Sequence, residues 1–328
     1  MRINIKNMAI DGLLGLAVGD ALGVPYEFVS RRDVRGLRIH DMIGCDTGVD
    51  FESRWGYIIP AGAWSDDTSM TLAEMAAIRD DHGEIDHENI FTNFYRWWYL
   101  GEFTATGKSF GMGGTVGRAM NNFTLTQIPA VQCGQCNFED NGNGSLMRIL
   151  PFSLYCIAKG LSLDETVKVI NDGSRMTHGH EISMMGCMIF TAFLKYIDKW
   201  HVAEAWDKAR KINYGKYYGK QATDTYSLLL SDFFLEASDS CIGETGYVVD
   251  TLMTAVYSML HSRGFESAIL TAIGMGFDTD TAGAVTGALA GVCYGRGNIP
   301  LRWRKKLLKR HLLASTAKNF AKALIDGK

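Results

Sequence analysis

Residues 274–291 read GMGFDTDTAGAVTGALAG, and this stretch decides how the chain is expected to fold. From Asp280 onward almost every position is apolar or small and none is proline, which predicts a buried helix over roughly residues 280–294. Three glycines in it recur every four residues, so they lie on one helical face and let a neighbouring backbone approach closely. The same spacing recurs near the N-terminus. The two glycine rows are Gly283, Gly287 and Gly291, and Gly15, Gly19 and Gly23.

The rest of the chain extends this helical pattern. Apolar residues recur at three and four positions over ten stretches, whereas strict alternation is scarce and short, with Ile3, Ile5 and Ile39 as the most strand-like positions. No fixed-period repeat or low-complexity linker marks a boundary. We therefore predict one all-α domain over residues 1–328. The expected helices cover roughly residues 8–23, 69–81, 88–100, 163–171, 180–199, 222–237, 248–260, 265–275, 280–294 and 300–325.

Composition narrows the functional class. With 328 residues, 47% of them hydrophobic, the chain can bury a large core, and a net charge of -3 disfavours a dedicated nucleic-acid binder. The N-terminal stretch is interrupted by Asp11 and Asp20, so we expect neither a signal peptide nor a membrane span. The pair Cys133 and Cys136 lacks a second ligand pair for zinc. We expect a cytoplasmic monomer.

Two acidic motifs stand out because each opens a predicted helix. The first is GAWSDDTSM, with Ser65, Asp66 and Asp67, and the second is FDTDT, with Asp278 and Asp280. A helix start needs one capping side chain, and a second adjacent carboxylate adds repulsion unless a cation is close. No Lys or Arg occurs between residues 265 and 294.

The two motifs together are typical of a site for hard cations. Carboxylate and hydroxyl oxygens favour Mg²⁺, Mn²⁺ or Ca²⁺ over zinc, and this many carboxylates indicate two ions that share ligands. The alternative is two ordinary capped helices. The joint pattern favours the metal site.

Other candidate positions are weaker when taken alone. Glu27 follows the first predicted helix and is an ordinary solvated position unless a family pattern gives it a role. The turn NGNGS, with Asn143, Gly144 and Ser145, precedes a helix whose first N–H groups could hold phosphate. His178 and His180 are two residues apart, so they point in different directions and suit ligand binding or capping better than shared metal ligation.

At this point the sequence resembles the ADP-ribosylglycohydrolase family. The matching stretches follow the family's order over most of the chain. They are GLAVGDALGVPYEF, GAWSDDTSM, GEFTATGKSFGMGGT, NGNGSLMRILPF, MTHGHE, GYVVDTLMTAVY and FDTDTAGAVTGALAG. The resemblance implies a compact all-α fold, an orthogonal multi-helix bundle, with a binuclear Mg²⁺ centre at which Mn²⁺ can substitute.

The family's functional positions carry over residue by residue. Its glutamate in a flexible loop falls on Glu27. The implied metal ligands are Ser65, Asp66, Asp67, Asp278, Asp280 and Thr281. The implied substrate contacts are Asn143, Gly144, Ser145, His178 and Tyr247, with Gly107 and Phe110 as weaker candidates.

Three positions depart from the family pattern. Ser65 stands where many members have Thr, and it keeps the hydroxyl ligand. Gly276 and Phe277 replace a pair of small residues before the last acidic motif. Gly111 stands where many members have an acidic residue, which removes a contact on the substrate side.

The expected reaction is metal-dependent hydrolysis of the bond between ADP-ribose and an acceptor, with protein arginine as the first candidate. Asp67 or Glu27 is the expected general acid or base, and Asp66 can accept a proton from metal-bound water. Alternatives are serine-, nucleic-acid- or metabolite-linked ADP-ribose, immunity against an ADP-ribosylating toxin, and a catalytically silent relative. The expected partner is an ADP-ribosylated protein or a small ADP-ribose conjugate, and nucleic acid enters only as a modified substrate.

Overall fold

The computed structural model describes residues 4–45, 59–197 and 201–327. Over this part of the chain the regular structure is helical, with short 3-10 turns between helices and two isolated β-bridges. The all-α prediction is therefore confirmed. The α-helices are α1 (Ile5–Gly23), α2 (Arg31–Gly36), α3 (Asp66–Asp80), α4 (His87–Leu100), α5 (Gly114–Thr126), α6 (Leu150–Lys159), α7 (Leu163–Arg175), α8 (Glu181–Tyr196), α9 (Val202–Arg210), α10 (Lys220–Thr225), α11 (Ser227–Leu230), α12 (Val248–Leu260), α13 (Phe265–Ile273), α14 (Thr279–Tyr294), α15 (Leu301–Lys306) and α16 (Arg310–Asp326).

The two glycine rows pack against each other, and this contact forms the centre of the fold. A Cβ atom added to Gly19 would lie 1.9 Å from the carbonyl oxygen of Gly283, and one added to Gly15 would lie 2.1 Å from that of Gly287. Residue numbers rise along α1 as they fall along α14 in these pairs, so the two helices are antiparallel. A side chain on either face would force the helices apart, and the end of α1 would then leave the start of α14.

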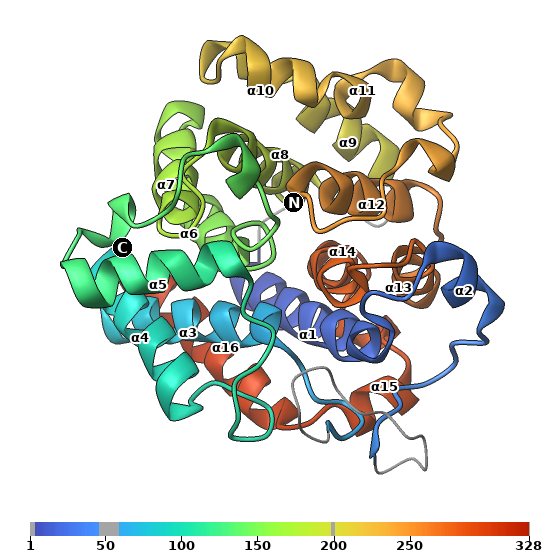
Figure 1. The fold of residues 1–328 in the computed structure, drawn as a ribbon, viewed down its shortest axis with the longest axis horizontal. Coiled ribbons are helices and arrows are strands. Elements are labelled where there is room, and N and C mark those ends of the chain that lie inside the picture. Colours follow the sequence, from blue (N-terminus) through green and yellow to red (C-terminus); the bar gives the residue numbers. More distant parts are fainter. Residues whose placement is uncertain (1–3, 46–58, 198–200, 328) are drawn as a thin grey trace.

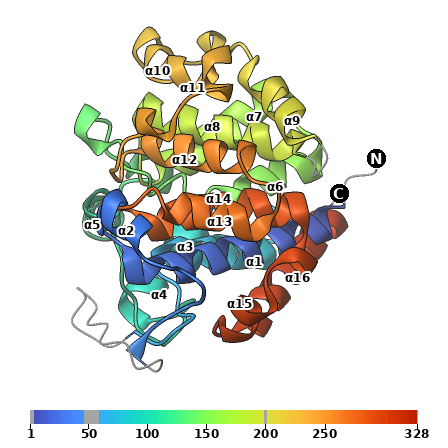
Figure 2. The same cartoon turned by 90° about the vertical axis from the view of Figure 1, so that its right-hand side faces the viewer.

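The remaining helices form layers around this pair (Figures 1 and 2). In Figure 2, α12 and then α7, α8 and α9 lie on one side of α14, with α10 and α11 outermost. On the other side α1 packs against α3 and α16, and α3 packs against α4. The starts of α3 and α14 and the end of α1 therefore meet inside the molecule.

Local sequence signals explain most helix boundaries. Ser162 and Glu165 form a reciprocal capping box at the start of α7. Asp86 accepts hydrogen bonds from two backbone N–H groups of α4, and Gly101 ends that helix in a left-handed conformation. Pro151 lies in the first turn of α6, where a backbone N–H would have no acceptor within the helix, so proline is tolerated there.

Several predicted elements were wrong in detail. The stretch 222–237 is not one helix but α10, α11 and a 3-10 turn. The stretch 300–325 is split at Lys309, which has a positive φ of 41°. Ile5 begins α1 instead of a strand, Ile39 lies outside regular structure, and Ile3 lies outside the described residues. The predicted stretches also omit α5, α6 and α9, although buried residues recur at helical spacing in α9 (Ala205, Trp206 and Ala209) and in α5 (Val116, Ala119 and Met120).

The N-terminal helix also bears on the membrane prediction. The stretch Ile5–Tyr26 is long and apolar enough to pass a length-and-hydropathy test for a membrane span, and 83% of its most apolar window is buried inside the molecule. Its packing against α14, α3 and α16 gives it the role of a core helix.

Candidate active site

The two acidic motifs converge at the inner ends of three helices. Asp67 comes from the first turn of α3, Asp280 from the first turn of α14, and Asp20 from the last turn of α1. Each offers a carboxylate oxygen, and these oxygens lie within 4.8 Å of one another in a buried position. Such a cluster is costly unless protons or cations compensate it.

Asp20 replaces the capping side chain of α3. Its Oδ1 accepts hydrogen bonds from the backbone N–H (2.9 Å) and hydroxyl (3.0 Å) of Ser65, and its Oδ2 accepts from the N–H (3.0 Å) and hydroxyl (2.6 Å) of Thr68. Ser65, at the N-cap, makes no capping bond with its own side chain. Because α1 supplies the cap, the interpretation of Asp66 and Asp67 as ordinary capping residues loses its basis.

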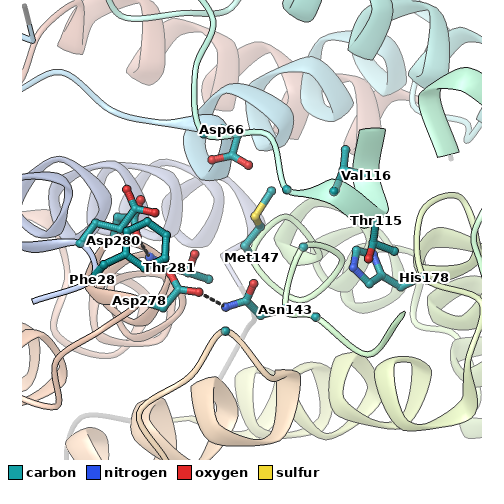
Figure 3. A pocket seen from close by; sticks show the side chains of 17 residues that line it. Phe28, Asp66, Thr115, Val116, Asn143, Met147, His178, Asp278, Asp280 and Thr281 are labelled. Atoms are coloured by element: carbon teal, nitrogen blue, oxygen red, sulfur yellow. Dashed lines mark hydrogen bonds between the residues drawn. The ribbon is translucent and has the colours of Figure 1, made fainter. Parts of the chain in front are cut away.

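At the start of α14, too, the N-cap side chain does not cap its own helix. Asp278 occupies the N-cap without a side-chain capping bond, and its Oδ2 instead accepts a hydrogen bond of 2.8 Å from the Asn143 amide. The same amide nitrogen contacts the Thr251 hydroxyl at 2.9 Å. The Asn143 turn therefore orients a carboxylate of the acidic cluster (Figure 3).

The charge state of the cluster shows how strongly the protein resists ionising it. Burial, followed by repulsion from neighbouring carboxylates, raises the pKa of Asp66, Asp67 and Asp280 well above the usual range. Burial also raises the pKa of Asp20 to about 6, against the opposing effect of its four hydrogen bonds. Without a cation, these carboxyl groups therefore hold their protons to a higher pH than an ordinary aspartate does.

The donor set fits a divalent cation. Asp67 Oδ1 is buried and has no hydrogen-bond partner among the residues that the structure describes, although buried carboxylate oxygens are normally satisfied. The Ser65 and Thr281 hydroxyls approach Asp67 Oδ2 at 3.0 and 3.5 Å, so neutral oxygens complete an all-oxygen environment. Such ligands suit Mg²⁺ or Mn²⁺.

A cavity of about 220 Å³ opens onto the cluster. Figure 3 shows Asp278, Asp280 and Thr281 at one end and His178 with Thr115 at the other, with Met147 between them. The full lining consists of Glu27, Phe28, Asp66, Gly111, Gly113, Gly114, Thr115, Val116, Gly142, Asn143, Gly144, Met147, His178, Gly246, Asp278, Asp280 and Thr281.

The end of the cavity away from the carboxylates is built to donate hydrogen bonds. It contains the start of the 13-residue helix α5: residues 113–116 line the cavity, and the N-cap Gly113 supplies no side chain to cap the first N–H groups. His178 is buried beside it, and burial, then the nearby Arg148 charge, lowers its pKa to about 3. A helix N-terminus and a neutral imidazole suit a phosphate group.

The structure separates the predicted site residues into three groups. Those on the cavity wall are Glu27, Asp66, Asn143, Gly144, His178, Asp278, Asp280 and Thr281. Ser65 and Asp67 lie buried behind that wall. The others are outside the lining: Ser145 accepts a hydrogen bond from the Ser174 hydroxyl in the core, Phe110 is buried, and Tyr247 forms the N-cap of α12. Gly107 also lies outside the lining, in the loop before α5.

One prediction about a helix start is corrected. Ser145 lies in a turn, and the helix after it begins only at Leu150. The helix start on this part of the cavity wall therefore belongs to α5 and not to α6. His180 caps α8, one of the two roles expected for the histidine pair, and its Nδ1 accepts a hydrogen bond of 3.2 Å from the Ile182 N–H.

Sequence reasoning missed Asp20, and it identified the glycine-rich turn into α5 without giving it a role. In the sequence, Asp20 is a single acidic residue among small and apolar residues. This isolation was the one signal that its carboxylate could bind the start of another helix. The segment 113–116 follows GKSFGM, and its glycines gave the signal of an exposed backbone.

The mouth of the cavity carries backbone strain. Phe28 and Phe277 both have positive φ angles, 63° and 62°, and their rings meet edge-on with centroids 5.2 Å apart. The N–H of Phe28 donates to the carbonyl of Phe277, and the N–H of Phe277 donates to that of Val29 at 2.7 Å. This double link ties the loop carrying Glu27 to the motif carrying Asp278. Strain of this kind is common at functional sites.

The family model described as ADP-ribosylglycohydrolase matches residues 1–327. The chain belongs to the ADP-ribosylglycohydrolase family. It is 30% identical over 314 residues to the ADP-ribosylarginine hydrolase Tri1 of Serratia proteamaculans, covering 93% of this chain and 76% of that one. It is 26% identical to the ADP-ribosyl-[dinitrogen reductase] glycohydrolase of Rhodospirillum rubrum, covering 93% and 91% of the two chains.

A solved structure of an ADP-ribosylglycohydrolase-related protein complex superposes with a TM-score of 0.74 at 25% identity, covering 97% of this chain and 98% of that chain. The acidic cluster and the cavity therefore sit in an ADP-ribosylglycohydrolase fold. One departure from the family pattern has a physical explanation here. Gly111 has a φ of +94°, and a Cβ atom there would lie 2.1 Å from Asp66 Oδ1, so this ADP-ribosylglycohydrolase leaves no space for an acidic side chain at that position.

Proposed function

We propose that this ADP-ribosylglycohydrolase hydrolyses the glycosidic bond between ADP-ribose and arginine on a modified protein, with two Mg²⁺ ions as cofactors. The observation that carries the proposal is the buried carboxylate cluster, with an unpaired Asp67 oxygen, at one end of a cavity whose other end offers N–H donors. Arginine is chosen because the relative from Serratia proteamaculans is named an ADP-ribosylarginine hydrolase.

The residues that would hold the ions supply only oxygen atoms. They are Ser65, Asp66, Asp67, Asp278, Asp280 and Thr281. When bound, the ions would lower the pKa of a coordinated water and neutralise the carboxylates. Asn143 keeps Asp278 in place, and Asp20 keeps the start of α3 in place, so the ligand positions are fixed before substrate arrives.

The chain's own residues then divide the work. The bond at the anomeric carbon breaks through an oxocarbenium-like state, and the departing guanidine requires a proton. Glu27 lies on the cavity wall, and we assign it the proton transfer to the acceptor side. Asp66, also on the wall, takes the proton of the attacking water. Asp67 lies behind the wall and serves as a ligand and a proton reservoir.

The donor end would hold the diphosphate. The N–H groups at the start of α5 and the His178 ring face the same space as Gly144. Because the carboxylates and the donor end lie at opposite ends of the cavity, the ribose would lie at the cations and the phosphates at the helix (Figure 3). In this arrangement the partial positive charge of the helix N-terminus would face the diphosphate, the most negatively charged part of the ligand.

A panel of substrates tests the proposed linkage. Arginine-, serine- and nucleic-acid-linked ADP-ribose are incubated with the protein and Mg²⁺, and released ADP-ribose is quantified. Preferential release from arginine supports the proposal. Release only from serine- or nucleic-acid-linked ADP-ribose would refute arginine as the acceptor but would still support the proposed active site. Absence of release from every substrate, with ADP-ribose still bound, would instead identify a binding protein.

A further inference from the structure

A buried chain of polar contacts connects α3 to the donor end of the cavity. Glu74 of α3 pairs with Arg148, and both side chains are 0% exposed. The Arg148 guanidinium also donates to Thr177 Oγ1 at 2.7 Å and to the Gly173 carbonyl at 3.0 Å. Thr177 Oγ1 lies 2.9 Å from Nδ1 of His178, which lines the cavity. The acidic helix and the imidazole are thus joined through two intervening side chains.

The chemistry of these groups fixes the direction of the hydrogen bonds. A guanidinium only donates, so Thr177 Oγ1 accepts from Arg148. The hydroxyl has one hydrogen, and in the part of the chain that the structure describes its remaining side-chain neighbour is His178 Nδ1. If Nδ1 carried a proton instead, the hydroxyl hydrogen would stay unpaired in a residue that is 0% exposed, which is unfavourable.

His178 must then carry its proton on Nε2. The burial of the ring, and then the positive charge of Arg148, oppose a second proton and lower the pKa of His178 to about 3. The Nε2 edge faces the turn at the cavity wall, because Cβ atoms added to Gly142 and Gly144 would both lie 3.5 Å from Nε2. In Figure 3 the ring lies at the same end of the cavity as Thr115, at the start of α5.

We propose that Arg148 and Thr177 are positioning residues that hold His178 in the neutral, Nε2-protonated form, so that the cavity presents one fixed N–H donor to a phosphate oxygen of its ligand. This inference rests on the proposed function for the identity of the ligand. The tautomer itself does not depend on it. The Glu74 side chain is the buried partner that keeps Arg148 in place in the core.

The first test is spectroscopic and uses the ligand-free protein. The chain has eight histidines, so histidine labelled with ¹⁵N gives few signals, and His178→Gln identifies the one of interest. The proposal expects a neutral ring with the proton on Nε2 and an accepting Nδ1 at neutral pH. A proton on Nδ1, or an imidazolium, in the wild-type protein would overturn it.

Two variants of one residue separate positioning from mere packing. Thr177→Ser keeps the hydroxyl, and we expect the wild-type spectrum. Thr177→Val keeps the shape, removes the hydroxyl and leaves the Glu74–Arg148 pair intact. We expect the Nδ1 hydrogen bond to be lost and both tautomers to appear. Thermal melts verify that both variants are folded. A single Nε2-protonated ring in Thr177→Val would show that the hydroxyl does not select the tautomer and would refute the relay.

The second test measures ADP-ribose binding by calorimetry with Mg²⁺. With the two tautomers about equally populated, Thr177→Val should bind about twofold more weakly, because the apparent affinity falls in proportion to the fraction in the binding form, and Thr177→Ser should match the wild type. Equal affinity of all three proteins would refute the coupling between tautomer and ligand. If the wild type does not bind ADP-ribose, the proposed function fails, while the spectrum of the ligand-free protein still decides the tautomer.

Discussion

Replacing Asp280 by Asn tests whether the acidic motifs form one repelling cluster. The side-chain oxygens of Asp20, Asp67 and Asp280 lie within 4.8 Å of one another. Two unit charges at that distance repel by about 3.5 kcal/mol at an effective dielectric constant near 20. Protonation, shown by the raised pKa values, removes part of this repulsion, so about 1–2 kcal/mol should remain in the metal-free protein.

Asp280→Asn keeps the acceptor for the Thr281 N–H, which lies 3.0 Å from Asp280 Oδ1. We expect the metal-free variant to melt about 2–4 °C higher than the wild type, since about 1 kcal/mol shifts a domain of this size by about 2 °C. With saturating Mg²⁺ the order should reverse, because the wild type gains binding energy that the variant lacks.

Paired thermal melts with chelator and with Mg²⁺ provide the measurement. Asp224→Asn is the matched control, because it removes the same charge from an exposed pair with Lys220. Its melting temperature should barely change in either condition. If Asp280→Asn is destabilised equally with chelator and with Mg²⁺, Asp280 is a structural residue of α14, and the reasoning from a shared cluster is refuted.

Three further predictions concern the same site. Because burial and repulsion raise the pKa of Asp67 and Asp280 well above 3.8, and burial raises that of Asp20 to about 6, the folded protein binds these protons more tightly than the unfolded chain does. The free energy of unfolding of the metal-free protein, measured with urea, should therefore fall as the pH rises from about 4 through these raised pKa values, and a flat profile would contradict the burial of the cluster. Asp20→Asn presents an amide N–H₂ to donors that need an acceptor, so it should lose about 1–3 kcal/mol of stability in urea with chelator and with Mg²⁺ alike; a stabilised variant would show that Asp20 is not the cap of α3. Gly111→Ala brings Cβ to 2.1 Å from Asp66 Oδ1 at a φ of +94°, so strain of about 1–3 kcal/mol should lower the Mg²⁺ affinity measured by calorimetry by about 5- to 150-fold. Gly297→Ala, with no atom within 4 Å of the added Cβ, should bind Mg²⁺ normally.

The parts of the fold that follow a simple period could be predicted from the sequence. The glycine rows predicted a close backbone approach, and the structure confirms it with contacts between Gly19 and Gly283. Helices with a clear apolar stripe and caps, such as α4 and α7, were found near their true ends. Where local signals compete, as at Lys309 with its positive φ, tertiary packing divides a stretch that looks continuous.

The candidate site was only half visible in the sequence. Carboxylates at two helix starts are a local pattern, so the sequence alone is enough to select Asp66, Asp67, Asp278 and Asp280. The role of Asp20 could not be predicted in this way, because it depends on α1 ending beside the start of α3, more than forty residues away in sequence. The Arg148–Thr177 link is equally non-local, since no motif marks its members as partners.

The most direct test of the central claim is hydrolysis of ADP-ribosylated arginine by protein stripped of metal with a chelator, while Mg²⁺ is then titrated back. If the two acidic motifs form one cation site at the scissile bond, release of ADP-ribose is absent in the stripped protein and returns with added Mg²⁺ or Mn²⁺. Full turnover in the metal-free protein would contradict the account.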